Sequence, residues 1–264
     1  MVSYIDVVRQ TLSRLPSVET KNIHGSAVVF DNRDLRFENN KEFPMASVVF
    51  SIITNYNPTV LHVVCPPELQ SDWLEAFGDF VLIQFIEREF PYTKDGFSKL
   101  MLDPTFWENF AGDNVLVFQR DSALLKEIPE NKYKRTLYIG APYAKFRDEH
   151  CHIPFMMNNA YGWKDMHDLP LNGMNGGLSI RNIGWTKTML EQFPPEKIPM
   201  LPPEDVYFSH LLSLRGKAYE YEGHIPTFWE AAEFSVESLP YPKPYGVHVP
   251  NIHNQLTFQN FNLI

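Results

Sequence analysis

The feature that most constrains the fold is a regular alternation of short apolar runs with helical segments in the first half of the chain. Apolar runs of the kind that form buried strands occupy residues 26–30, 59–65, 80–86 and 115–119. Segments with helical character separate them at residues 45–56, 69–77 and 95–110. Because strand, helix and strand in succession build a parallel sheet with right-handed crossovers, we predict an α/β fold with a mostly parallel sheet flanked by helices.

The second half of the chain is organised differently. Further strands are expected at residues 137–140 and 178–181, a Gly/Asn-rich loop at 172–177 and a helix at 204–214. Another helix is expected near the start of the chain, at residues 4–15. No internal repeat or low-complexity linker divides the chain, so we predict one domain over residues 1–264, with one half at about 25–122 and the other at about 123–254.

The composition is that of a globular protein, because 44% of the 264 residues are hydrophobic and 21% are charged. A formal net charge of −9 argues against nucleic acid or acidic lipid as a partner. No apolar run approaches the ~20 residues that span a bilayer, and the first residues lack a signal-peptide pattern. We therefore expect a cytoplasmic protein without a membrane span. Its two cysteines, Cys65 and Cys151, are expected to be buried thiols rather than a disulfide.

Polar side chains follow two of the predicted parallel strands. Asp31 and Arg33 come after the first strand, and Gln119 and Asp121 come at the end of the fourth. Ligands of parallel sheets bind at the carboxyl ends of strands, and a carboxylate there can hold a divalent cation through hard oxygen. An aspartate followed by a serine is also typical of a turn or a helix N-cap, and from spacing alone this structural interpretation is favoured for Asp121.

Two further segments carry residues that suit a binding site. Gly176 and Gly177 would let the backbone approach a ligand closely, or would simply form a tight turn. Glu204 and Asp205 stand at a predicted helix start, where acidic residues are favoured by the helix dipole. One of the two could instead take a proton from an incoming hydroxyl while the other fixes the acceptor.

Two single residues have equally open interpretations. His248 is a possible metal ligand, although a solitary histidine is more often structural. Trp163 could stack on a sugar ring or could be an ordinary core aromatic.

Seven segments of the chain form a pattern in a fixed order. They are Asp31-Asn32-Arg33, Phe118-Gln119-Arg120-Asp121-Ser122, Tyr138-Ile139-Gly140-Ala141-Pro142-Tyr143, Asn175-Gly176-Gly177-Leu178-Ser179-Ile180-Arg181, Glu204-Asp205-Val206-Tyr207-Phe208, Phe234-Ser235-Val236-Glu237 and Pro244-Tyr245-Gly246-Val247-His248. Taken together, they resemble a family of GT-A-like glycosyltransferases long catalogued as a domain of unknown function, and the resemblance spans roughly residues 25–254.

The resemblance implies roles for the residues of the donor site. GT-A enzymes usually carry an Asp-x-Asp motif at the end of the fourth strand, and this chain has Gln119 at its first position and Asp121 at its last. Asp121 and His248 would hold Mn²⁺ or Mg²⁺. Asp31 and Arg33 would lie near the nucleoside, with Gln119 at the donor.

The resemblance also implies roles on the acceptor side. Asp205 would be the catalytic base of an inverting transferase, and Glu204 would orient the acceptor. Gly176 and Gly177 would line the donor sugar and the acceptor, with Asn175 and Trp163 contacting the acceptor as well.

The resemblance thus predicts a metal-dependent glycosyltransferase that moves a sugar from a nucleotide-diphosphate donor to the hydroxyl of a glycan or another acceptor. The alternative is a non-catalytic nucleotide- or sugar-binding module on the same fold, which Gln119 in place of an acid favours. A metal-dependent phosphohydrolase would need more clustered carboxylates than the sequence shows.

Overall fold

A computed structural model describes residues 24–35, 45–88, 91–143, 152–163, 173–237, 239 and 241–248. Within these residues, six strands form the main sheet in the spatial order β3-β2-β1-β4-β7-β6. β1, β2, β3 and β4 pair in parallel, whereas β7 is antiparallel to both of its neighbours, β4 and β6. The strands are β1 (His24–Phe30), β2 (Pro58–Val64), β3 (Ile83–Phe85), β4 (Asn114–Phe118), β6 (Tyr138–Pro142) and β7 (Met174–Asn182).

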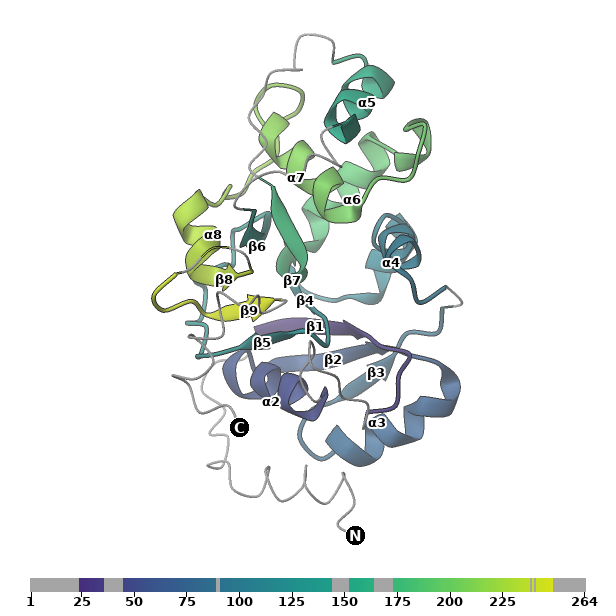
Figure 1. Ribbon diagram of the computed structural model, residues 1–264, viewed down its shortest axis with the longest axis vertical. Helices are drawn as coiled ribbons and strands as arrows, with labels where there is room; N and C mark the ends of the chain where they lie inside the picture. Colours follow the sequence, from purple (N-terminus) through teal and green to yellow (C-terminus); the bar gives the residue numbers. More distant parts are fainter. Residues whose placement is uncertain are drawn as a thin grey trace.

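The central strands are buried because nearly all their side chains are apolar. Ala27, Val28 and Val29 of β1 are fully buried, as are the four apolar residues of β4, which suits a sheet covered on both faces. In Figure 1, α2 and α3 accompany β1, β2 and β3 in the lower part, and α5, α6 and α7 lie beyond β6 and β7 in the upper part. The α-helices are α2 (Met45–Asn55), α3 (Gln70–Phe77), α4 (Lys94–Met101), α5 (His152–Tyr161), α6 (Ile183–Gln192), α7 (Glu204–Leu214) and α8 (Phe228–Phe234).

The predicted α/β fold with a mostly parallel sheet is confirmed, and two local predictions are wrong. The helix expected over 95–110 is divided into α4 and a 3₁₀ helix at Pro104–Asn109. Asp103 caps the second piece, and Pro104 has no N–H with which to continue the first. The loop expected at 172–177 is wrong from Met174 onward, because those residues belong to β7. The predicted helix at 4–15 and the thiol of Cys151 lie outside the described residues, whereas Cys65 is a free, buried cysteine.

The first half of β7 departs from regular pairing with β6. Ser179 lies opposite Gly140 while Met174 lies opposite Pro142, so five steps along β7 match two along β6. The side chain of Asn175 accepts a hydrogen bond of 2.7 Å from the backbone N–H of Gly177 inside this bulge. A bulge of this kind redirects the chain locally, and here it does so beside the carboxyl ends of β1 and β4.

A small three-stranded sheet joins two distant parts of the chain. It has the order β5 (Ser122–Leu124), β9 (Gly246–His248) and β8 (Ser235–Val236). β5 begins directly after Asp121, and its first residue pairs with His248. Asp121 therefore precedes a strand, which contradicts the N-cap interpretation of this residue. Among the described helices, none is long and apolar enough to cross a bilayer.

Candidate active site

A cavity of about 1020 Å³ lies where β1 and β4 end, where β7 begins and where α7 starts. These strand ends meet the start of β7 because β7 is antiparallel to β4, so its first residues lie at the edge at which the parallel strands finish. Of the residues proposed from the sequence, all but Trp163 line the cavity: Asp31, Arg33, Gln119, Asp121, Asn175, Gly176, Gly177, Glu204, Asp205 and His248.

The ends of β1 and β4 are joined by a buried ion pair. Nε of Arg120 lies 2.6 Å from Oδ2 of Asp31, and both side chains are almost completely buried. The other oxygen, Oδ1 of Asp31, accepts hydrogen bonds from the backbone N–H of Arg33 at 2.9 Å and from its Nε at 3.1 Å. Both oxygens of Asp31 thus hold arginines in place, and the cavity floor has a fixed distribution of charge.

Asp121 is held by a turn and faces His248. The hydroxyl of Ser122 accepts from the N–H of Gln119 at 3.2 Å and donates to the carbonyl of Gln119 at 2.6 Å. This closes the turn and directs Asp121 toward His248, with Oδ1 and Nε2 separated by 3.4 Å.

Each member of this pair shifts the pKa of the other. Burial by itself lowers the pKa of His248, but Asp121, with the charges of Glu237 and Asp205, raises it above the ordinary value. Burial likewise acts to raise the pKa of Asp121, and the His248 contact outweighs it and holds that pKa below the usual range. Each member of the pair thus favours the charged form of the other.

Gly176 and Gly177 bring the backbone of β7 against two different side chains. A Cβ on Gly177 would lie 2.0 Å from Nε2 of His248, and a Cβ on Gly176 would lie 2.1 Å from Oε1 of Glu204. Neither position has room for a side chain. The tight-turn interpretation is wrong, because both glycines belong to β7. The groups that their backbone approaches are His248 and Glu204, and a close approach to a ligand stays a prediction.

Glu204 pairs with an arginine from the middle of β7. Its Oε2 lies 2.6 Å from Nη2 of Arg181, and both side chains are buried. The guanidinium of Arg181 also lies against the rings of Tyr138 and Phe208, at 4.9 and 5.4 Å from their centroids. Burial raises the pKa of Glu204 to about 7, although Arg181 opposes the shift. The pair fixes the start of α7 against the sheet.

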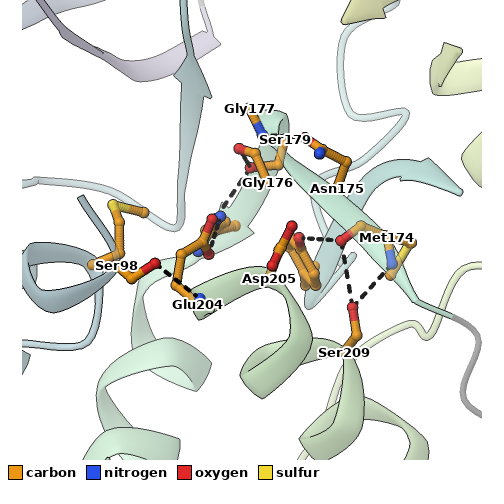
Figure 2. A network of polar contacts seen from close by, with 12 residues as sticks. Ser98, Met174, Asn175, Gly176, Gly177, Ser179, Glu204, Asp205 and Ser209 are labelled. Carbon is orange, nitrogen blue, oxygen red and sulfur yellow. Dashed lines mark hydrogen bonds and ion pairs between the residues drawn. The ribbon is translucent and has the colours of Figure 1, made fainter. Parts of the chain in front are cut away.

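Asp205 is the more accessible carboxylate of the two, and it faces the cavity from the first turn of α7. Figure 2 shows Glu204 and Asp205 rising from the start of this helix toward the strand that carries Gly176 and Gly177. Tyr143, directly after β6, donates its hydroxyl to Oδ2 of Asp205. Burial and the charge of Asp205 raise the pKa of Tyr143 far above its ordinary value, so this hydroxyl stays protonated and remains a donor.

The residues present fit a divalent cation in part. Two ligands about 2.1 Å from one ion in octahedral geometry stand ~3 Å apart, which is close to the separation of Asp121 and His248. Among the described residues, no group of three or more His, Cys, Asp or Glu side chains is placed to hold a metal. Mg²⁺ commonly takes one or two carboxylates and completes its shell with substrate phosphates and water, so a site with two protein ligands suits an ion that arrives with a diphosphate.

Trp163 lies outside the cavity. Its ring packs against those of Tyr161 and Phe193, each with a centroid separation of 4.9 Å. The structure therefore gives it the surroundings of a core aromatic. The sequence analysis assigned no role to three residues in or beside the cavity, namely Arg120, Tyr143 and Arg181. All three lie inside the segments that carried the family resemblance.

Comparison with known proteins gives a family and a similar fold. The family model described as "Protein of unknown function (DUF5672)" matches residues 81–248. No curated protein sequence matches the chain. Among solved structures, the fold is similar to that of mouse xyloside xylosyltransferase 1 in its apo form, with a TM-score of 0.51 and 10% sequence identity over 88% of this chain and 99% of that one. At this identity the likeness shows the fold alone, which is that of GT-A glycosyltransferases.

Proposed function

The chain belongs to the DUF5672 family, and we propose that it is a glycosyltransferase that moves a sugar from a nucleotide-diphosphate donor to an acceptor hydroxyl. One observation carries the proposal: on a GT-A-like fold, Asp121 with His248 and Asp205 line the same cavity. A strand-end carboxylate suits the charged end of a donor, and a helix-start carboxylate suits an incoming hydroxyl.

Asp205 is the proposed base. It takes the proton of the acceptor hydroxyl, and the acceptor oxygen attacks the anomeric carbon from the side opposite the diphosphate. The bond between that carbon and the diphosphate oxygen breaks, and the configuration inverts. Tyr143 holds Oδ2 of Asp205 through its hydrogen bond, and the ion pair of Glu204 with Arg181 fixes the helix that carries the base.

Asp121 and His248 are the residues that would hold Mn²⁺ or Mg²⁺. When bound, the cation supplies positive charge that offsets the charge developing on the leaving diphosphate. Arg33 and Lys94 also line the cavity and add positive charge near the donor, while Gln119 supplies a neutral amide where many GT-A enzymes have an acid.

The first experiment is a thermal-shift screen of nucleotide sugars with Mn²⁺, followed by a transfer assay with the donor that stabilises the protein. A ligand that binds the native state at 100 times its Kd adds about 2.7 kcal/mol of stability. With that donor, Asp205→Asn should lose about 10²–10⁴-fold in kcat while its donor Kd stays within twofold of native. Native turnover in this variant would refute the assignment of the base.

Asp121→Ala is the matched variant for the proposed metal site. It should weaken donor binding in the presence of Mn²⁺ and leave the weaker binding in EDTA unchanged, as measured by calorimetry. A donor that binds the native protein without any transfer or hydrolysis, together with equal behaviour of Asp205→Asn, would favour the non-catalytic binding module instead.

A further inference from the structure

The cavity has one apolar edge. Among the described residues, the large apolar side chains with substantial exposure are Leu74, Phe80, Leu82, Phe155, Met200, Leu201, Ile225, Phe228 and Trp229. Of these, Met200 and Leu201 line the cavity, with exposed fractions of 44% and 41%. What distinguishes these two from the other exposed apolar residues is that they are neighbours in sequence and line a cavity, where they offer an apolar surface to a ligand.

The position of these two residues assigns them to the acceptor. They precede Glu204 and Asp205 by only a few residues and line the same cavity. The arginines and Asp121, which suit a diphosphate, come instead from the ends of β1 and β4, and His248 reaches Asp121 from β9. A group that contacts Met200 and Leu201 therefore lies on the side of the proposed base, where the hydroxyl that loses its proton must be.

The backbone around the pair is stiff. Pro199 precedes it and Pro202 and Pro203 follow it, and each proline fixes its own φ. Few backbone torsions of the segment are therefore free, which reduces the ordering that binding requires. Pro202 is itself buried, which ties the segment to the body of the protein.

We propose that Met200 and Leu201 form a subsite for an aliphatic group of the acceptor, next to the hydroxyl that receives the sugar. Both side chains are aliphatic, whereas the flat face of a sugar ring is usually met by an aromatic residue. Methionine in particular adapts its shape to flexible apolar ligands. Identifying the ligand as the acceptor rests on the proposed function, whereas the apolar subsite itself is tested by binding alone.

The test compares two probes that differ only in their alkyl group, methyl β-D-glucoside and n-octyl β-D-glucoside, the latter below its micelle-forming concentration. Ligand-observed NMR titrations of the full chain give both dissociation constants. The native protein should bind the octyl probe about tenfold to thirtyfold more tightly, the scale set by removing two half-exposed aliphatic side chains from water. The double variant Met200→Ser/Leu201→Ser should lose that preference.

Leu82→Ser is the matched control. Leu82 is 67% exposed and lies outside the cavity, so this variant should keep the octyl preference, and thermal melting of all three proteins checks that each is folded. A preference below threefold in the native protein would overturn the subsite, as would a preference retained by the double variant.

These outcomes are independent of catalysis. If the octyl preference and its loss are observed but no donor supports transfer, the apolar subsite stands and the transferase proposal fails. If transfer occurs with no alkyl preference, the transferase proposal stands and the subsite fails.

Discussion

Three of the carboxylates that line the cavity are fixed by partners from other parts of the sequence. Asp31 is held by Arg120, Glu204 by Arg181, and Asp205 by Tyr143. A catalytic group whose rotamer is set in advance needs no reorganisation during the reaction, which is why such supporting contacts matter for rate. At the scale of single residues, the fixed geometry of these pairs is the main property of the site.

Tyr143→Phe tests this view for the proposed base. The change removes one hydroxyl and keeps the ring, so Asp205 remains but its carboxylate can rotate. We expect kcat to fall about tenfold, the scale of one lost hydrogen bond to a charged group, with little change in the KM of the donor. Steady-state kinetics at saturating donor gives both values.

Tyr161→Phe is the control for that measurement. Its hydroxyl donates to the carbonyl of Phe193 at 3.0 Å, and it lies outside the cavity. This variant should retain native kcat. Equal effects of the two substitutions would mean that Tyr143 contributes only to the stability of the fold.

At the scale of elements, β7 is the strand on which the site depends. Gly177→Ala places a methyl group 2.0 Å from the position of His248 Nε2, and overpacking of this kind costs about 1–3 kcal/mol. The same substitution in a His248→Ala background should cost less, because the ring that it strikes is gone. Urea unfolding of the four proteins gives the coupling free energy, expected at about 1 kcal/mol or more. Additive effects within ~0.5 kcal/mol would show that the contact is not the cause.

The sequence predicted the elements better than their arrangement. Strands and helices with a long, clear apolar pattern, such as β4 and α7, appear close to the expected residues. The direction of β7 and its bulge were not predictable, because both depend on pairing with β4 and β6, which local periodicity does not encode. The division of α4 from the following 3₁₀ helix was readable in principle from Asp103 and Pro104.

For the candidate site, ten of the residues that line the cavity were predicted, whereas Arg120, Tyr143 and Arg181, which hold three of its carboxylates, were not. Strand ends and a helix start converge in a parallel α/β fold, so Asp121 and Asp205 could be placed from element order and the family resemblance. Arg120, Tyr143 and Arg181 act through contacts across long stretches of chain. An arginine in an apolar strand was the available signal for Arg181, since a charge in such a place requires a partner. Trp163 was named as a possible sugar contact but packs against other aromatic rings, because the presence of an aromatic residue does not indicate whether it contacts a ligand or the core.

At the scale of the whole molecule, buried histidines make the fold sensitive to acid. Burial lowers the pKa of His62 and of His210 to about 4. Between about pH 6.5 and pH 4 the unfolded chain binds these protons and the native chain does not, so stability is lost as the pH falls. The loss is about 1.4 kcal/mol per pH unit for each histidine. Glu204, whose pKa is raised, acts in the opposite direction as the pH rises from about 4.5 to about 7.

The contribution of one histidine can be isolated with His62→Leu, which keeps an apolar contact for Phe110 and removes the titrating ring. The free energy of unfolding of this variant minus that of the native protein should increase by about 2 kcal/mol as the pH falls from 6.5 to 5, because only the native protein loses the contribution of His62. Urea unfolding at both pH values measures it, with His152→Gln at an exposed position as the control. A difference that does not change with pH would rule out the lowered pKa.

The antiparallel pairing of β4 with β7 determines which contacts two fragments of the protein would have to re-form. It runs from Asn114 opposite Asn182 to Phe118 opposite Leu178, and it joins the segment that supplies Asp121 to the segment that supplies Gly177 and the approach to α7. A chain opened between β5 and β6 would give one fragment with Asp121 and another with Gly177, Asp205 and His248. Complementation of such fragments would depend on rebuilding this ladder and the pairing of β5 with β9, so the contacts that reunite the sheets would also reassemble the candidate active site.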